Sequence, residues 1–229
     1  MIPENRVENG SFPIPKLLIN KEDIACFMKE FKGFHTQFAD CFSREEPREN
    51  FYQYMAGQMS QLERKSIEPI ALNVKSAKVR AMQHFLSDIP WEEERILSRY
   101  HGMVSDDLGD AEGVLIFDES GFVKKGNDSV GVSRQYCGNV GKVENCQVGV
   151  YASYASRHGY GFLDNRLFIP QKWFGEDYAE RRKKCRLPAE SSFKTKPQLA
   201  VEMLEKIVGE EVIPFRYVAA DSIYGNSPE

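Results

Sequence analysis

Two short apolar runs that each end at an aspartate constrain this chain more than any other feature. Residues 114–117 form a continuous apolar run that stops at Asp118, and residues 215–220 form a second run that stops at Asp221. A continuous apolar run like residues 114–117 is typical of a strand that is buried on both faces. The sequence therefore predicts a buried central strand that ends at Asp118 and another strand that ends at Asp221.

A helical pattern between the two runs predicts how the strands are related. Thr195 and Gln198 have the spacing of a capping box, Pro197 lies near the helix start, and Gly209 ends the pattern. A crossover through such a helix makes the two strands parallel, so we expect both aspartates at the same edge of one sheet. An aspartate after a strand also commonly forms a turn or caps a helix, and the spacing alone leaves that alternative open.

Two aspartates in this arrangement predict a site for divalent cations. Carboxylates that lie close together repel each other unless a cation lies between them, and hard cations such as Mg²⁺ prefer oxygen ligands. Two such ions about 4 Å apart activate an attacking hydroxyl and stabilise a leaving oxygen in phosphoryl transfer. We therefore expect Asp118 and Asp221 to hold metal for phosphoryl chemistry.

Two more strands are expected between the aspartates. Residues 129–137 and 146–154 are rich in Val and Tyr and are separated by a turn that contains Gly138 and Gly141. Together with residues 114–117 they predict a three-stranded meander, followed by the helix and the last strand. This part of the chain is therefore predicted to be an α/β domain with a mixed sheet.

The first hundred residues have a helical period instead. Asn20 is suited to cap a helix whose apolar face consists of Ile24, Phe27, Met28 and Phe31. Further helical patterns follow, the last of them beginning near Pro90.

A polar stretch with glycine at residues 105–112 then marks a change of character. We therefore predict an all-α N-terminal domain at residues 1–105 and an α/β domain at residues 106–229.

Composition narrows the classes of protein to which the chain can belong. The 229 residues carry a formal net charge of −4 and give a pI near 5.7, so any DNA-binding surface must be local. The five cysteines are odd in number and form no C-x-x-C pair, which argues against a disulfide framework and a zinc site. Residues 1–10 lack the apolar core of a signal peptide, and no apolar run reaches about 18 residues. We expect a cytoplasmic protein that does not associate with membranes.

Several sequence blocks, taken in order, resemble one protein family. V-L-I-F-D-E-S-G-F-V-K-K-G at residues 114–126 contains Asp118, and A-A-D-S-I-Y-G at residues 219–225 contains Asp221. Between them lie S-R-Q-Y-C-G (133–138), G-K-V-E-N-C-Q-V-G-V (141–150), R-L-F-I-P (166–170) and F-K-T-K-P (193–197). These blocks, together with L-E-R-K-S-I-E-P-I-A at residues 62–71, resemble bacterial insertion-sequence DDE transposases. The resemblance extends over nearly the whole chain from about Phe31.

The resemblance implies a fold, a reaction and a set of partners. It implies an RNase H-like catalytic domain of the retroviral-integrase superfamily, preceded by a helical domain that binds DNA. Asp118 and Asp221 match the first two catalytic, metal-binding acids, with Mg²⁺ or Mn²⁺ as the cofactor. The implied reaction is DNA cleavage and strand transfer at transposon ends, in the cytoplasm at the bacterial nucleoid. A homo-oligomer is consistent with the resemblance.

The chain departs from the family at the third acid, a glutamate on a helix well past the second aspartate. Glu229 follows Asp221 too closely to fill that role. We therefore expect a C-terminally truncated transposase that is inactive alone and has an exposed sheet edge. Two alternatives stay open: a non-catalytic DNA-binding or interaction remnant of a transposase, and an RNase H-like nuclease.

Basic residues of the second domain are the candidates for contacts with DNA phosphates. A basic helix with aromatic neighbours can follow a DNA backbone, and Trp173 and Phe174 precede a dense basic run. Exposed basic residues are also common on ordinary solvated surfaces. The candidates are Lys124, Lys125, Arg134, Lys142, Arg181, Arg182, Lys183 and Lys184.

Overall fold

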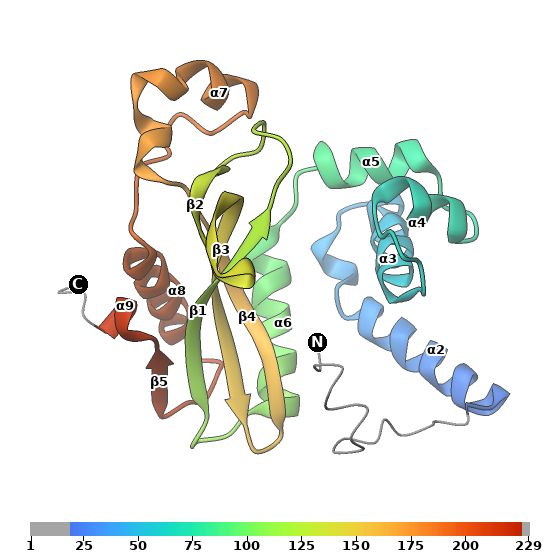
Figure 1. Cartoon of the computed structure of the whole chain (residues 1–229). Coiled ribbons are helices and arrows are strands. Elements are labelled where there is room, and N and C mark those ends of the chain that lie inside the picture. Colours follow the sequence, from blue (N-terminus) through green and yellow to red (C-terminus); the bar gives the residue numbers. More distant parts are fainter. Residues whose placement is uncertain (1–18, 226–229) are drawn as a thin grey trace, which may run out of the picture. The chain divides into compact units, whose positions relative to one another are not determined.

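The chain divides into two compact units, Met1–Glu92 and Glu93–Glu229. The computed structural model describes residues 19–225 (Figure 1). The expectations for residues 1–10 and for Glu229 lie outside this part of the chain. None of the helices within residues 19–225 is long and apolar enough to cross a membrane.

The first unit is helical, as predicted. Its elements are α2 (Lys21–Thr36), the 3-10 turn η1 (Ala39–Cys41), α3 (Glu45–Met59), α4 (Ile67–Asn73) and α5 (Val79–Ser87). Asn20 caps α2 as expected, because its side chain accepts from the backbone N–H of Asp23 and the Asp23 carboxylate accepts from the N–H of Asn20. The apolar face predicted for this helix is mostly exposed, however, and only Phe31 is buried.

Aromatic side chains and two short helices form the interior of this unit. The Phe85 and Trp91 ring centroids are 4.5 Å apart, and the indole N–H of Trp91 donates to the Phe85 carbonyl at 2.9 Å. Ile70 of α4 and Met82 of α5 are fully buried and pack together. Gly57 of α3 allows the close approach of Ile70, because a Cβ at Gly57 would lie 2.1 Å from Ile70 Cγ2.

The second unit contains one sheet and the helices that cover one of its faces. Its elements are α6 (Glu93–Leu108), β1 (Val114–Val123), β2 (Ser133–Cys137), η2 (Gly138–Val140), β3 (Lys142–Ser156), β4 (Gly159–Phe168), η3 (Gln171–Phe174), η4 (Glu176–Tyr178), α7 (Ala179–Lys184), α8 (Lys196–Glu210), β5 (Tyr217–Ala220) and α9 (Ser222–Gly225).

Helix α6 belongs to this second unit, so the division after Glu92 lies earlier than the boundary expected after residue 105. The hydroxyl of Tyr100 donates to the Phe162 carbonyl at 2.8 Å, and that of Ser105 donates to the Val212 carbonyl at 2.7 Å. Helical periodicity identified α6 as a helix, but only these long-range contacts show which unit it joins.

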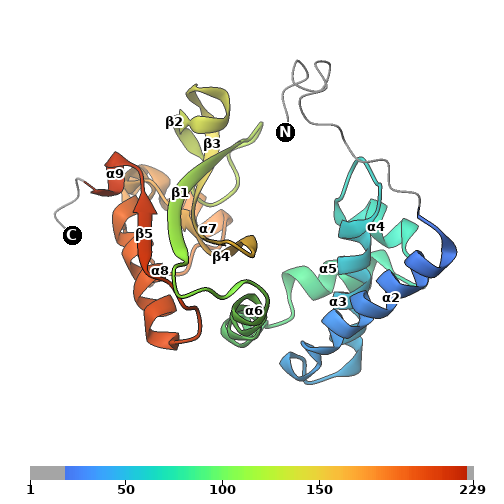
Figure 2. The same cartoon turned by 90° about the horizontal axis from the view of Figure 1, so that it is seen from below.

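The sheet is mixed and RNase H-like. Its strand order is β2-β3-β1-β5, and β4 also pairs with β3. The expected meander of β1, β2 and β3 was wrong in its order, because β3 lies between β1 and β2 and pairs antiparallel with both. β4 also pairs antiparallel with β3, whereas β5 lies parallel to β1 after the crossover through α8. Figure 2 shows β5 beside β1, with α8 next to them. The predicted α/β class and the predicted parallel relation are therefore confirmed.

Two further expectations about the strands were wrong. β4 was not predicted, because its alternation of small, polar and aromatic residues lacks the continuous apolar run that identifies a buried strand. β1 does not end at Asp118 but continues to Val123, and Asp118 pairs with Tyr151 of β3 in the middle of the strand. The apolar run marks only the part of β1 that lies under the helices.

The main core lies between one face of the sheet and helices α6 and α8. Leu115 and Phe117 of β1, Tyr154 of β3 and Met203 of α8 are among the buried residues of this core. Because side chains alternate along a strand, Asp118 points to the opposite face, where it is exposed. The core therefore anchors the strand that carries Asp118 without burying its carboxylate.

Candidate functional site

The register of two parallel strands brings the two aspartates together. Phe117 of β1 pairs with Ala220 of β5, the last paired position of that ladder. Asp118 and Asp221 are the next residues on the two strands, and neighbouring strands lie about 4.8 Å apart. The register brings the two aspartates to the same level of the sheet, but the predicted position at its edge was wrong for Asp118, because β1 continues to Val123.

Each aspartate has one oxygen engaged by the backbone next to it. Oδ1 of Asp118 accepts from the N–H of Glu119 at 2.8 Å, and Oδ1 of Asp221 accepts from the N–H of Ile223 at 2.9 Å. The second contact turns the chain from β5 into α9, so Asp221 also has the helix-capping role that sequence spacing had left open. Within residues 19–225, no protein donor is found for Oδ2 of either residue.

This arrangement fits a hard cation. Both carboxylates are exposed, both have a free oxygen, and carboxylate oxygens are the ligands that Mg²⁺ and Mn²⁺ prefer. Within the described residues, no group of three or more His, Cys, Asp and Glu side chains is arranged to hold a metal ion. The site therefore offers two acids.

Glu119 is adjacent in sequence to Asp118 but does not extend this site. Side chains alternate along β1, so Glu119 points to the face that α8 covers. There its Oε1 accepts from Lys196 Nζ at 2.6 Å and its Oε2 accepts from the Tyr224 hydroxyl at 2.7 Å. Glu119, Lys196 and Tyr224 are called the carboxylate triad below.

The carboxylate triad joins three of the sequence blocks described above. Glu119 follows Asp118, Lys196 starts α8, and Tyr224 lies in α9 after Asp221. Burial, the hydrogen bond to Glu119 and the negative charges of Glu119, Asp118 and Asp221 all raise the pKa of Tyr224 above its ordinary value, so its hydroxyl stays a donor. The sequence does not predict these contacts, because they join residues 77 and 105 positions apart.

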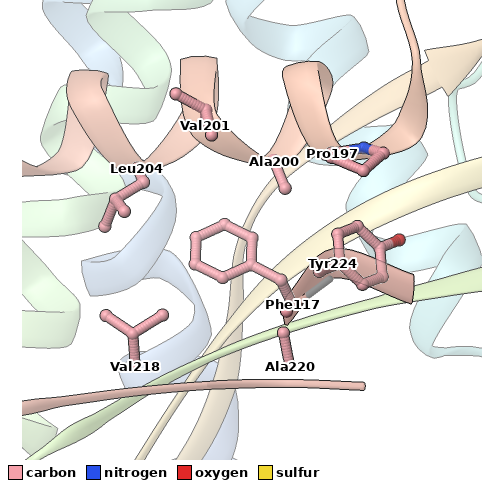
Figure 3. Close-up of a pocket in the computed structure, with 9 residues that line it drawn as sticks. Phe117, Pro197, Ala200, Val201, Leu204, Val218, Ala220 and Tyr224 are labelled. Carbon is pink, nitrogen blue, oxygen red and sulfur yellow. The ribbon is translucent and has the colours of Figure 1, made fainter. Parts of the chain in front are cut away.

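An apolar pocket lies beside the triad, between α8 and the strands β1 and β5. Its volume is about 350 Å³. Figure 3 shows the Phe117 ring pointing from β1 toward α8, with Tyr224 at one end of the pocket near Pro197 and Val218 at the other. Every residue of β5 is exposed, which agrees with the expected exposed sheet edge.

Comparison with known proteins identifies the family. The family described as DDE superfamily endonuclease matches residues 37–229, which is most of the chain. The chain belongs to the DDE superfamily endonucleases. This family generally uses a divalent metal, which agrees with the two exposed carboxylates.

One relative of this DDE endonuclease is a protein of Microchaete diplosiphon described as the probable transposase of insertion sequence element IS701. It is 32% identical to the chain over 179 residues, which cover 78% of the chain and 43% of the relative. The chain thus spans less than half the length of this relative. No solved structure matches the chain.

The basic residues of this DDE endonuclease that were predicted to contact DNA differ in their contacts within the fold. Arg182 is engaged within the fold, because its guanidinium donates to the carbonyls of Trp173 at 2.5 Å and Gly175 at 2.7 Å. Trp173 is itself fully buried and donates its indole N–H to the Val132 carbonyl at 3.0 Å. Arg182 is half-exposed, so its predicted contact with DNA stays a prediction beside this structural role.

The other residues of the basic run stay accessible. Arg181 lies 4.8 Å above the Tyr178 ring, Lys183 is exposed, and Lys184 pairs with Asp128 at 2.7 Å. The Lys184–Asp128 pair ties α7 to the loop between β1 and β2. Figure 1 shows α7 beyond the end of the sheet toward which β1 runs.

The remaining candidates lie on β1, β2 and β3. Lys124 follows β1 and is half-buried, whereas its neighbour Lys125 is exposed. Arg134 is exposed on β2, and Lys142 at the start of β3 pairs with Glu144 at 3.0 Å. Of these candidates, Lys125 lies in the β1–β2 loop, to which the Lys184–Asp128 pair also connects α7.

Proposed function

We propose that this chain is the part of an insertion-sequence transposase that contributes the first two acids of the active site. In this proposal Asp118 and Asp221 bind Mg²⁺ or Mn²⁺ and support the cleavage and transfer of DNA strands at transposon ends. The helical first unit is proposed to bind DNA. The observation that carries the proposal is the pairing of Phe117 with Ala220, which aligns the two aspartates on adjacent strands.

The chemistry of the aspartates supports this proposal. Each carboxylate is oriented by a backbone N–H through one oxygen, which leaves the other oxygen for a metal ion. A bound divalent ion would supply Lewis-acid activation of the attacking water or 3′-hydroxyl and charge stabilisation of the leaving oxygen. Asp118 and Asp221 would hold the ion, and the ladder between β1 and β5 would bring the two strands that precede them side by side.

The proposed DNA surface extends from this site toward α7. Lys125, Arg181, Lys183 and Lys184 are exposed or half-exposed cations that can contact phosphates. Lys124, Arg134 and Lys142 are proposed to add phosphate contacts from β1, β2 and β3. Contacts of this kind position DNA without reading its sequence.

Metal binding by the chain of residues 1–229 tests the acid pair. We expect Mn²⁺ to bind, as detected by loss of the free-ion electron paramagnetic resonance signal, and Asp118→Asn or Asp221→Asn to abolish that binding. Asp177→Asn is the matched control, because Asp177 is an exposed aspartate on η4 in the same unit. Unchanged Mn²⁺ binding by Asp118→Asn would remove the basis of the proposal.

A DNA assay with the same chain tests the contribution of the two acids. Supercoiled plasmid that carries the DNA flanking this gene is incubated with the chain and Mg²⁺. Because the described residues offer two acids and not three, we expect DNA binding without cleavage. Strong Mg²⁺-dependent cleavage that Asp118→Asn abolishes would instead show that the two acids suffice. Absence of both metal and DNA binding would favour an interaction remnant.

A further inference from the structure

The carboxylate triad connects β1, next to Asp118, to the helix α9 that follows Asp221. Glu119 is bonded by a lysine at 2.6 Å and by a tyrosine at 2.7 Å, and these partners come from two different helices. The side chains of Lys196 and Glu119 are only 22% and 18% exposed. A largely buried ion pair of this kind recovers little net stability, because removing both charges from water costs about as much as their attraction returns. We therefore look for the role of this ion pair in the positions of the elements that it holds together.

The geometry that the triad specifies is that of the second aspartate. The Tyr224 and Gly225 N–H groups both donate to the Asp221 carbonyl at 3.2 Å, and the Ile223 N–H donates to the Asp221 carboxylate. Helix α9 has only four residues, so its own hydrogen bonds are too few to hold it in place. The Tyr224 hydroxyl connects this short helix to Glu119, the residue next to Asp118.

Lys196 completes the connection from the other side. It lies at the start of α8, whose capping box at Thr195 and Gln198 fixes the first turn of that helix. Its ammonium also lies 5.7 Å from the centre of the Phe168 ring, which further restrains it. Glu119 is therefore held between a rigid helix and the element that carries Asp221.

We propose that Glu119, Lys196 and Tyr224 are positioning residues, which fix α9 and so set the position of Asp221 relative to Asp118. This inference rests on the proposed function, because the spacing of the two aspartates matters for a shared metal ion. The triad does not bind the ion. It lies on the face of the sheet that α8 covers, opposite to the face on which Asp118 is exposed, and it acts on Asp221 through the backbone of α9.

The decisive variant is Tyr224→Phe, which removes one hydroxyl and keeps the ring that lines the apolar pocket. Tyr217→Phe is the matched control, because Tyr217 is an exposed tyrosine on β5, close in sequence to Asp221, and no hydrogen bond is found for its hydroxyl within residues 19–225. Two properties are measured on the chain of residues 1–229: hydrogen exchange of the Ile223, Tyr224 and Gly225 amides, and the Kd for Mn²⁺.

We expect Tyr224→Phe to speed exchange of these amides about tenfold, because a hydrogen bond to a charged group restrains local opening. We expect it to raise the Kd for Mn²⁺ about tenfold, the usual effect of removing a contact that orients a metal ligand. Glu119→Gln keeps an oxygen that can accept from Tyr224 but loses the charge that pairs with Lys196, so its effect should be smaller. Tyr217→Phe should change neither property.

The outcomes separate this proposal from the proposed function. If Asp118→Asn abolishes Mn²⁺ binding and Tyr224→Phe leaves exchange or affinity unchanged, the positioning role is wrong and the metal site stands. If Asp118→Asn leaves Mn²⁺ binding intact, the metal site itself is wrong, and the positioning role is wrong with it. The positioning role is supported if Tyr224→Phe shows faster amide exchange and weaker Mn²⁺ binding while Tyr217→Phe changes neither property.

Discussion

Phe117 and Ala220 are the last paired residues of the parallel ladder between β1 and β5, and each is followed by an aspartate. Phe117 points into the core toward α8, so the next residue on β1 must point to the open face of the sheet. The burial of one aromatic ring thus determines the direction of the Asp118 carboxylate. A helix cap sets the direction of Asp221.

Thermal unfolding should reveal the repulsion between these two carboxylates. Without metal, Asp118→Asn removes one of two like charges on adjacent strands, so we expect a higher Tm than that of the wild type. Added Mg²⁺ should raise the Tm of the wild type, because an ion that binds only the folded state stabilises it, and should leave the variant unchanged. Differential scanning calorimetry, first without metal and then with Mg²⁺ raised in 10-fold steps of concentration, measures both effects. A lower Tm for the variant without metal would contradict the expected repulsion.

The basic run should divide into a structural residue and DNA-binding residues. Arg182→Ala loses two hydrogen bonds to backbone carbonyls, so we expect it to lower the free energy of unfolding by about 1–2 kcal/mol. Lys183→Ala should leave stability within about 0.5 kcal/mol and weaken DNA binding, with the slope of log Kd against log salt reduced by about 1. Urea unfolding and fluorescence anisotropy with duplex DNA measure these quantities. An unchanged salt slope for Lys183→Ala would exclude a phosphate contact.

A buried histidine should make a large contribution to the stability of the second unit. His101 of α6 is fully buried, with Nδ1 2.5 Å from Glu210 Oε2 of α8 and Nε2 3.1 Å from the Leu163 carbonyl of β4. Glu210→Ala leaves Nδ1 without its partner, which should cost about 1–3 kcal/mol in urea unfolding. Glu205→Ala, an exposed glutamate on the same helix, should cost less than about 0.5 kcal/mol. Equal stability of the two variants would show that the His101 contact contributes little.

Stability at alkaline pH should depend on Cys146. Burial, together with the neighbouring Cys137, raises the pKa of this thiol from 9.0 to about 11. Below pH 9 the thiol is protonated in both states, whereas between about 9 and 11 it ionises first in the unfolded chain, so stability falls as the pH rises through this window. Cys146→Ala should remove part of that fall. Urea unfolding at pH 8, 9 and 10 tests this, and parallel curves for wild type and variant would contradict it.

Sequence periodicity predicted the elements whose signal is local. The capping box at Thr195 and Gln198 and the cap at Asn20 appear in the structure as expected, and the two apolar runs lie in β1 and β5, although β1 continues beyond Asp118. These features depend on residues only a few positions apart, so a single sequence contains the whole signal. The same reasoning extended to Asp118 and Asp221, because a crossover helix has few alternatives.

Features that depend on distant contacts were not predicted. β4 lacks a continuous apolar run because its outer residues are exposed, and its place in the sheet follows from pairing with β3. The structural role of Arg182 depends on carbonyls in the preceding turns, and the carboxylate triad joins residues from three blocks. Charge and residue type showed which side chains can interact, and only the fold shows which of them meet.

Two glycines in the helices of the first unit provide a matched pair for the last prediction. Replacing glycine by alanine within a helix usually stabilises it by about 0.5–1 kcal/mol, because alanine loses less backbone entropy on folding. At Gly33 of α2 nothing lies within 4 Å of the added Cβ, so this gain should be observed. At Gly57 of α3 the Cβ would lie 2.1 Å from Ile70 Cγ2, and Ile70 is fully buried and cannot move aside.

Gly57→Ala should therefore lower the free energy of unfolding by about 1–3 kcal/mol, the usual cost of overpacking a core. Gly57→Ala combined with Ile70→Val, which shortens the opposing side chain, should recover part of the loss. Urea unfolding followed by far-ultraviolet circular dichroism measures all three variants. A stabilising Gly57→Ala would mean that α3 and α4 can separate at this contact without cost, and the close approach of Gly57 and Ile70 would then have no role in holding the first unit together.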